Sequence, residues 1–274
     1  MRMTHDHLDA AVKHFGLTPT GPARLGLEDA SITTTAVNDG GERVWVKVAP
    51  IPSPAYWPRP QAHREAYDAL AGRVPMPRLC DEAAWPEPGE DEEGYRRWVR
   101  VEVYEYLRAP VVSATPELHE APGLSEEWWL QLRAATEEIA ATQEVGAGRP
   151  DRMIRHWIRE VGGRCPHHIT WEPCHGDLHW ANLHAGPDLV ITDWSGWGLA
   201  PRGLDAATLL VYSLPDPATV AWVRRVFGDV LESEDGWLAQ VYAAAEVLTA
   251  VDAGFHPQLE QPIRGLLAEL GIRG

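Results

Sequence analysis

The sequence predicts an α+β protein with two lobes: a small β-rich N-lobe and a larger, mainly helical C-lobe. β-branched runs separated by turn residues dominate the first hundred positions, whereas helical periodicity dominates after Pro110. The 274 residues are 45% hydrophobic, which is enough for one or two packed domains. We assign residues 1–104 to the N-lobe, 105–109 to a hinge and 110–274 to the C-lobe, and expect a functional cleft between the lobes.

The predicted N-lobe begins with an antiparallel meander. Residues 24–27 and 32–37 are short β-branched or apolar runs. The sequence Asn-Asp-Gly-Gly at 38–41 is a strong turn signal, and the alternating run at 43–48 follows it directly. These three runs are therefore expected to pair as neighbouring strands.

The rest of the N-lobe is expected to hold one helix and one more strand. The helix covers residues 61–70 and ends at Gly72, and the strand covers residues 99–107. The stretch 81–94 is acidic and rich in proline and glycine, so we expect an exposed loop there.

The predicted C-lobe consists mainly of helices. Ser125 has the form of a helix N-cap, because two glutamates follow it in the first turn and apolar residues recur at helical spacing beyond them. The pair Asp216-Pro217 predicts a second helix start. Further helical patterns cover residues 237–251 and 259–270.

Composition and charge exclude several function classes. Lys and Arg number 24 against 40 Asp and Glu, a net charge of −16 that disfavours nucleic acid and anionic membranes as partners. No apolar run is long enough to span a membrane, and the polar N-terminus does not resemble a signal peptide. Three cysteines without a C-x-x-C pair suit a reducing compartment. We therefore expect a cytoplasmic protein, and the sequence gives no oligomeric state.

One segment carries most of the chemistry. Residues 174–183 read C-H-G-D-L-H-W-A-N-L, and an I-T-D-W segment ending at Trp194 follows. Asn182 lies five residues after Asp177 and eleven before Asp193, a gap that suits two short strands joined by a turn. Carboxylate and amide oxygens suit a hard cation such as Mg²⁺.

These residues resemble the H-G-D-x-x-x-x-N loop and I-D-W segment of aminoglycoside phosphotransferases, which are relatives of choline kinases and protein kinases. The resemblance implies a protein kinase-like fold that uses ATP or GTP and Mg²⁺. It implies that Asp177 is the catalytic base and that Asn182 and Asp193 bind the metal. It also implies that His179, which occupies the place of a protein-kinase lysine, acts near the transferred phosphate.

The same resemblance extends to residues that would hold the nucleotide. Lys47, in the strand Val-Trp-Val-Lys-Val, matches the lysine that contacts nucleotide phosphates, and Glu65 matches its helix partner. Ser31 lies where a phosphate loop is expected. Glu105 and Leu107 fall in the hinge, whose backbone would form hydrogen bonds with the purine base of the nucleotide.

Two further residues are expected to support the catalytic loop rather than to react. His175 is predicted to anchor the loop through a hydrogen bond. Asp205 matches the aspartate of the family's G-x-x-x-x-D stretch and is predicted to brace the loop.

The resulting prediction is a phosphotransferase that acts on a hydroxyl of a small molecule, such as an aminoglycoside antibiotic. The net charge of −16 favours a cationic acceptor. A neutral nucleoside or sugar antibiotic, or a metabolite, stays open as the acceptor. The C-lobe acids considered for binding a cation are Asp216, Asp229, Glu232, Glu234, Asp235, Glu246 and Asp252.

Two other classes stay open. The first hairpin, residues 26–32, has one glycine and two acids in place of a glycine-rich phosphate loop, so a non-catalytic pseudokinase is one alternative. The H-x-D-x-H spacing from His175 to His179, together with Asp193, also suits a metal-dependent hydrolase. The zinc cluster considered with that hydrolase is Cys165, His167, His168 and Cys174.

Overall fold

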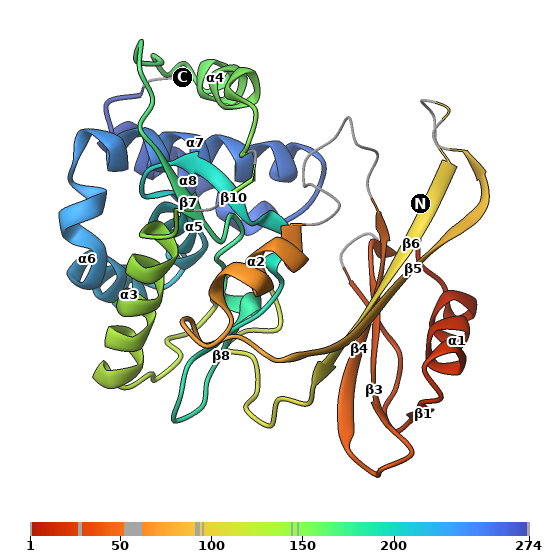
Figure 1. Ribbon diagram of the computed structural model, residues 1–274. Helices are drawn as coiled ribbons and strands as arrows, with labels where there is room; N and C mark the ends of the chain where they lie inside the picture. The colour runs from red at the N-terminus through yellow and green to blue at the C-terminus, as the bar shows by residue number, and fades with distance from the viewer. Residues whose placement is uncertain are drawn as a thin grey trace. The chain divides into compact units, whose positions relative to one another are not determined.

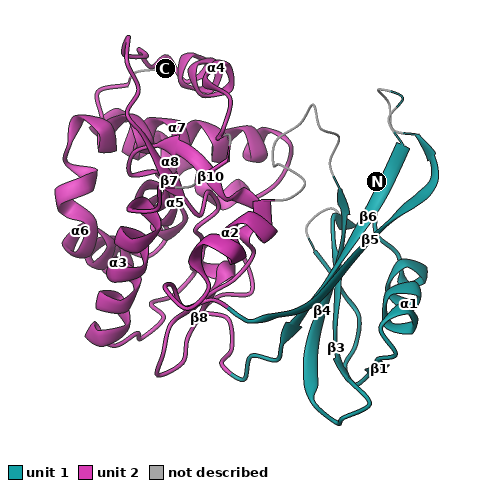
Figure 2. Ribbon diagram, in the orientation of Figure 1, with its two compact units in different colours: residues 1–60, 77–108 teal, residues 61–76, 109–274 magenta. Residues whose placement is uncertain are grey.

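The computed structural model describes residues 2–26, 29–51, 62–90, 94, 96–143, 145–146 and 148–272. The chain forms two compact units (Figure 2). Unit 1 comprises Met1–Pro60 and Pro77–Arg108, and unit 2 comprises Gln61–Met76 and Ala109–Gly274. Unit 1 is built on an antiparallel sheet and unit 2 is mainly helical, which confirms the predicted α+β class. The hinge at residues 105–109 stays a prediction.

Unit 1 contains one sheet and the helix α1 (His5–His14), which packs on it. The strand order is β1-β3-β4-β6-β5, with β2 paired to β3, and the pairs are antiparallel. The meander and the strand near residue 100 are therefore confirmed, whereas α1 was not predicted. The strands are β1 (Thr18–Pro19), β2 (Arg24–Leu25), β3 (Ile32–Val37), β4 (Arg43–Ile51), β5 (Leu79–Glu90) and β6 (Arg96–Glu105).

Alternation along β4 explains how the sheet packs. Val44, Val46 and Val48 are buried in the apolar cluster that α1 covers. Because successive side chains point to opposite faces, Lys47 lies on the other face of the strand. Lys47 is opposite Glu102 of β6 in the strand register.

The predicted loop at residues 81–94 is wrong where the structure describes it, because β5 runs from Leu79 to Glu90 and pairs with β6. Residues 91–93 of the predicted loop lie outside the described part of the chain. β5 is at the edge of the sheet, where prolines are tolerated because one side of the strand needs no hydrogen bonds. The register shift between Pro86 and Glu90 accommodates the intervening Pro-Gly segment.

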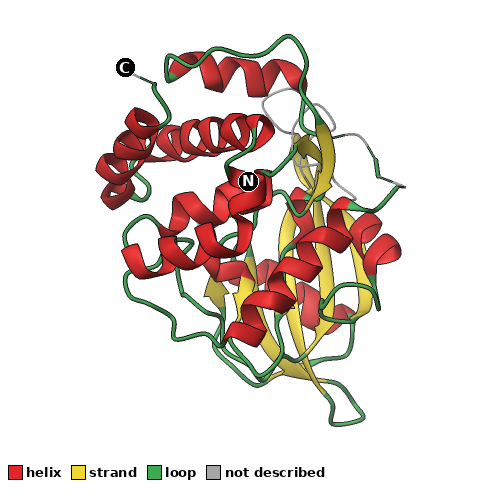
Figure 3. Ribbon diagram, turned by 90° about the vertical axis from the view of Figure 1, so that its left-hand side faces the viewer, coloured by secondary structure: helices red, strands yellow, loops and turns green. Residues whose placement is uncertain are grey.

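Unit 2 is built from seven α-helices among the described residues (Figure 1 and Figure 3). Ser125 accepts a hydrogen bond from Trp128 N and Asp216 accepts one from Thr219 N, so both predicted N-caps are confirmed. None of the described helices is both long and apolar enough to cross a membrane. The helices are α2 (Ala62–Leu70), α3 (Glu126–Ala140), α4 (Asp151–Glu160), α5 (Leu204–Ser213), α6 (Pro217–Leu231), α7 (Glu234–Asp252) and α8 (Glu260–Glu269).

Two short antiparallel sheets of two strands each in unit 2 carry the segment with the motif. β7 (Trp171–Cys174) pairs with β10 (Gly198–Pro201), and β8 (Leu183–His184) pairs with β9 (Val190–Ile191). The β8–β9 hairpin is the predicted pair of strands between Asn182 and Asp193. Both strand pairs contribute side chains to the apolar core, Cys174 and Ala200 from one pair and Leu183 and Ile191 from the other, so the ends of the loops between the strands are fixed.

Candidate active site

The loop that carries Asp177 leaves β7 through a tight turn. Gly176 has a φ of 82°, a conformation that favours glycine. A Cβ atom at Gly176 would lie 2.1 Å from the carbonyl oxygen of Gly196, so the close backbone approach also requires glycine. The glycine of the H-G-D motif is therefore explained by the backbone.

Asp205 braces this turn from the first turn of α5, as predicted. Its two carboxylate oxygens accept the N–H groups of His175 and Gly176 at 2.8 and 2.9 Å. Burial raises the pKa of Asp205, while the electrostatic interaction with His175 and the hydrogen bonds from the two N–H donors oppose that rise. Asp205 thus fixes the backbone immediately before Asp177.

His175 anchors the loop through both ring nitrogens. Nε2 lies 3.0 Å from the carbonyl oxygen of Thr192, and Nδ1 lies 3.3 Å from the backbone N of Asp177. A carbonyl only accepts and a backbone N–H only donates, so Nε2 carries the proton and Nδ1 accepts. The neutral imidazole therefore has a structural role, which confirms the predicted anchor.

Asp177 and His179 form an ion pair. Oδ2 of Asp177 lies 3.5 Å from Nε2 of His179, and the Asp177 side chain is 45% exposed. Burial acts to raise the pKa of Asp177, but the charge and hydrogen bond of His179, together with His175, outweigh burial and lower it. Burial acts to lower the pKa of His179, but Asp177 and Asp193 outweigh burial and raise it. The pair therefore favours an ionised carboxylate beside an imidazolium.

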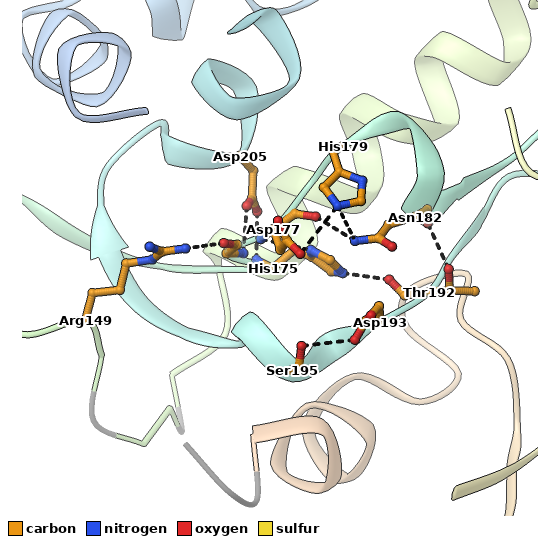
Figure 4. A network of polar contacts seen from close by, with 10 residues as sticks. Arg149, His175, Asp177, His179, Asn182, Thr192, Asp193, Ser195 and Asp205 are labelled. Carbon is orange, nitrogen blue, oxygen red and sulfur yellow. Dashed lines mark hydrogen bonds and ion pairs between the residues drawn. The ribbon is translucent and has the colours of Figure 1, made fainter. Parts of the chain in front are cut away.

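Asn182 is held in one orientation. Its Nδ2 donates to the carbonyl oxygen of Asp177 at 2.9 Å and lies 3.3 Å from Nε2 of His179. The backbone carbonyl of Asn182 accepts a hydrogen bond from the backbone N–H of Thr192 at 2.9 Å. Because the amide nitrogen faces the loop, the amide oxygen is turned away from Asp177 (Figure 4).

Asp193 directly follows the β8–β9 hairpin in a left-handed backbone conformation, with φ 60° and ψ 67°. Such a conformation is uncommon for residues other than glycine and occurs at functional sites. Ser195 Oγ donates to Asp193 Oδ1 at 3.0 Å, which orients the carboxylate.

The structure joins three predicted residues, Asp177, His179 and Asn182, by polar contacts (Figure 4). The fourth, Asp193, lies close enough for its charge to affect the pKa of Asp177 and of His179. The amide oxygen of Asn182 and the carboxylate of Asp193 are hard oxygen donors, and both belong to rigidly held segments. This donor set fits Mg²⁺.

The predicted nucleotide-binding residues are divided between the units. Lys47 lies buried on β4 in unit 1, and Glu65 lies on α2 in unit 2, so their pairing stays a prediction. Ser31 precedes β3, and its carbonyl accepts from Gly26 N at 2.8 Å. Glu105 exchanges hydrogen bonds with Arg78: its N donates to the Arg78 carbonyl, and its Oε1 accepts from Arg78 N. The backbone of Leu107 stays a predicted contact.

Three further residues near the loop were not assigned to it from the sequence. The ring of Tyr212 packs edge-on against His179 at 5.5 Å, and burial with nearby carboxylates raises the pKa of Tyr212. Arg149 donates to the carbonyl of Gly176 and to Glu246 on α7. These contacts join residues 27 to 97 positions apart, and no local pattern in the sequence marks them.

The proposed zinc cluster is not supported. Among the described residues, no group of three or more His, Cys, Asp or Glu side chains is placed to hold a metal ion. Cys174 is buried and donates to the carbonyl of Gly198, whereas Cys165 donates to that of Arg155.

Solved structures share the fold across nearly the whole chain. A thermostable mutant of aminoglycoside phosphotransferase APH(4)-Ia, in complex with ADP and hygromycin B, matches with a TM-score of 0.62 at 12% identity, covering 97% of this chain and 99% of that one. The amicoumacin kinase hAmiN, in complex with AMP-PNP, Ca²⁺ and Ami, matches with a TM-score of 0.59 at 13% identity, covering 97% and 92%.

A choline/ethanolamine kinase family protein from Mesorhizobium loti matches with a TM-score of 0.54 at 16% identity, covering 97% of this chain and 94% of that one. No protein-family model and no curated sequence matches the chain. The resemblance to aminoglycoside phosphotransferases and choline kinases is therefore confirmed in the fold.

Proposed function

We propose that this protein transfers the γ-phosphate of ATP or GTP to a hydroxyl group of a small molecule. The observation that carries the proposal is the network in which Asp177, Asn182 and Asp193 are held by backbone and side-chain contacts. The solved structures with this fold include complexes with nucleotides and with small molecules such as hygromycin B.

In the proposed reaction, Asp177 orients the acceptor hydroxyl and accepts its proton. The lowered pKa of Asp177 keeps the carboxylate ionised at neutral pH, and its partial exposure leaves room for an acceptor. His179 places a positive charge beside the transferred phosphate and holds Asp177 in place. Positioning and charge neutralisation supply most of the rate enhancement in phosphoryl transfer.

The oxygen of Asn182 and the carboxylate of Asp193 would hold Mg²⁺, which neutralises negative charge on the phosphates when bound. Lys47, supported by Glu65, would contact the phosphates, and Ser31 would donate to them. The N–H of Glu105 already donates to the carbonyl of Arg78. The carbonyl of Glu105 and the backbone of Leu107 would therefore contact the purine base of the nucleotide.

A screen of nucleotide consumption tests this proposal. ATP and GTP are each offered with Mg²⁺ and with aminoglycosides, nucleoside and peptide antibiotics, choline and amino sugars. We expect one acceptor class to be phosphorylated by the wild-type protein and not by the Asp177→Asn variant. Nucleotide binding without turnover on any acceptor would favour the pseudokinase alternative instead.

A further inference from the structure

A buried arginine in unit 2 has no role in the reaction as described so far. Arg149 lies between α3 and α4 and is 7% exposed. Its backbone N donates to the carbonyl of Leu199 on β10 at 2.8 Å. A Cβ atom at Gly148 would lie 2.0 Å from the same oxygen, so the segment runs in close contact with β10. This contact directs the Arg149 side chain toward the loop that follows β7 (Figure 4).

The guanidinium of Arg149 joins the loop to helix α7. Nη2 donates to the carbonyl oxygen of Gly176, the residue before Asp177. Nη1 donates to the hydroxyl of Tyr242 at 2.8 Å and to the carboxylate of Glu246. Tyr242 and Glu246 lie four residues apart on α7, so they present adjacent acceptors on one face of the helix.

The charges of this cluster suit a permanent cation. Burial acts to lower the pKa of Arg149, but Glu246, Tyr242 and Cys174 together outweigh burial and raise it. Burial raises the pKa of Glu246, and the charge of Arg149 opposes that rise. An arginine fixes two acceptor directions at once because its guanidinium is planar, whereas a lysine ammonium does not.

The held carbonyl belongs to the peptide group from which Asp177 extends. Asp205 fixes the N–H groups of His175 and Gly176, and Arg149 fixes the carbonyl oxygen of Gly176. The other polar group of that peptide, the N–H of Asp177, donates to Nδ1 of His175 at 3.3 Å, so the peptide before the proposed base is held at both its carbonyl and its N–H. An error of about 1 Å in the placement of a reacting group costs roughly 100-fold in rate.

We propose that Arg149 is a positioning residue that orients the Gly176–Asp177 peptide by tying it to Tyr242 and Glu246. The effect on turnover rests on the proposed phosphoryl transfer, whereas the effect on the loop does not. Arg149 acts through the backbone and does not itself contact the acceptor or the nucleotide.

The test compares Arg149→Met and Arg149→Lys with a matched control, Arg155→Met. Arg155 also joins a carboxylate, that of Asp151, to a backbone carbonyl, that of Pro166, but it contacts no residue of the loop. Hydrogen exchange is measured on peptides covering residues 174–183 and on those from α7, followed by kcat and the nucleotide KM with the acceptor that the screen identifies.

We expect Arg149→Met to speed exchange at residues 174–183 and to lower kcat by about 10- to 100-fold, with the nucleotide KM nearly unchanged. Arg149→Lys keeps a charge beside Glu246 but cannot reach both acceptors. Compared with Arg149→Met, the Lys variant should therefore restore more of the thermal stability than of kcat. The Arg155→Met control should leave loop exchange and kcat unchanged.

Wild-type kcat and wild-type loop exchange in the Lys variant would overturn the proposal, because charge alone would then suffice. Equal acceleration of exchange throughout unit 2 in Arg149→Met would also overturn the proposal, since that pattern indicates general destabilisation. If Arg149→Met does not fold, the Lys variant decides. If the wild type phosphorylates no acceptor, the proposed function fails, and loop exchange alone decides the positioning role.

Discussion

The carboxylate of Asp177 and the imidazole of His179 each change the proton affinity of the other. His179 lowers the pKa of Asp177, and Asp177 raises that of His179, so each group favours the charged form of the other. A carboxylate with a lowered pKa is a weak base, which suits a reaction whose transition state needs orientation of the hydroxyl more than early removal of its proton.

Asp177→Asn should lower kcat at least about 100-fold, since a positioned base contributes that much or more. Asparagine keeps the shape of the side chain, so nucleotide Kd and thermal stability should change little. The control is Asp188→Asn, an exposed aspartate in the neighbouring β8–β9 turn. Full turnover in Asp177→Asn would remove Asp177 from the mechanism.

Asp193→Ala should raise the Mg²⁺ concentration needed for half-maximal rate and lower kcat together, because a metal ligand is lost. Asn182→Ala should do the same and also loosen the loop, since Asn182 Nδ2 donates to the Asp177 carbonyl. Ser195→Ala is the control: it removes one hydrogen bond to Asp193 and leaves both proposed ligands. An unchanged Mg²⁺ requirement in Asp193→Ala would show that Asp193 does not bind the metal.

The elements with local signals were predicted well from the sequence. Ser125 and Asp216 cap α3 and α6 with short-range hydrogen bonds, and the gap between Asn182 and Asp193 specified the β8–β9 hairpin. Helix α5 was not predicted because its residues are almost all buried, so it has no alternation between apolar and polar faces. The sequence of β5 resembled that of a loop because it contains acids and prolines, which an edge strand tolerates.

The contacts that position the site depend on tertiary structure and have no such signal. Arg149 reaches Gly176 and Glu246 across 27 and 97 positions. Tyr212 lies beside His179 although 33 residues separate them in the sequence. The motif therefore identified the reacting side chains, while the groups that hold them required the fold.

The β7–β10 strand pair yields a prediction about pH. Glu172 on β7 accepts from Gly203 N at 2.7 Å, and burial raises its pKa despite that bond. A carboxyl whose pKa is raised by folding favours the folded state below its unfolded pKa, and this benefit is lost as pH rises through the folded pKa. Glutamine keeps the acceptor for Gly203 N without the charge.

Relative to wild type, Glu172→Gln should therefore be most stable near pH 7 and lose that advantage as pH falls toward about 4.3, the usual glutamate value. Thermal unfolding of both proteins at matched pH values measures the difference. A gap in melting temperature that stays constant from pH 7 to pH 4 would show that folding does not raise the pKa of Glu172.

For the whole molecule, the net charge of −16 bears on the acceptor. The acids first considered for binding a cation do not all serve that purpose. Asp216 caps α6, and Asp229 forms a two-bonded pair with Arg133. Glu246 is likewise paired, with the buried Arg149. A cationic acceptor would still be attracted by the overall negative field of the protein.

We therefore expect the preferred acceptor to carry positive charge, and we expect its kcat/KM to fall as ionic strength rises beyond physiological values. At physiological ionic strength the Debye length is about 8 Å, so added salt screens the long-range attraction while contacts within the site are affected less. The matched control is a neutral analogue of the same acceptor, whose kcat/KM should respond little to salt. A neutral or anionic preferred acceptor with salt-insensitive kcat/KM would reject the cationic acceptor and leave the phosphotransferase proposal intact.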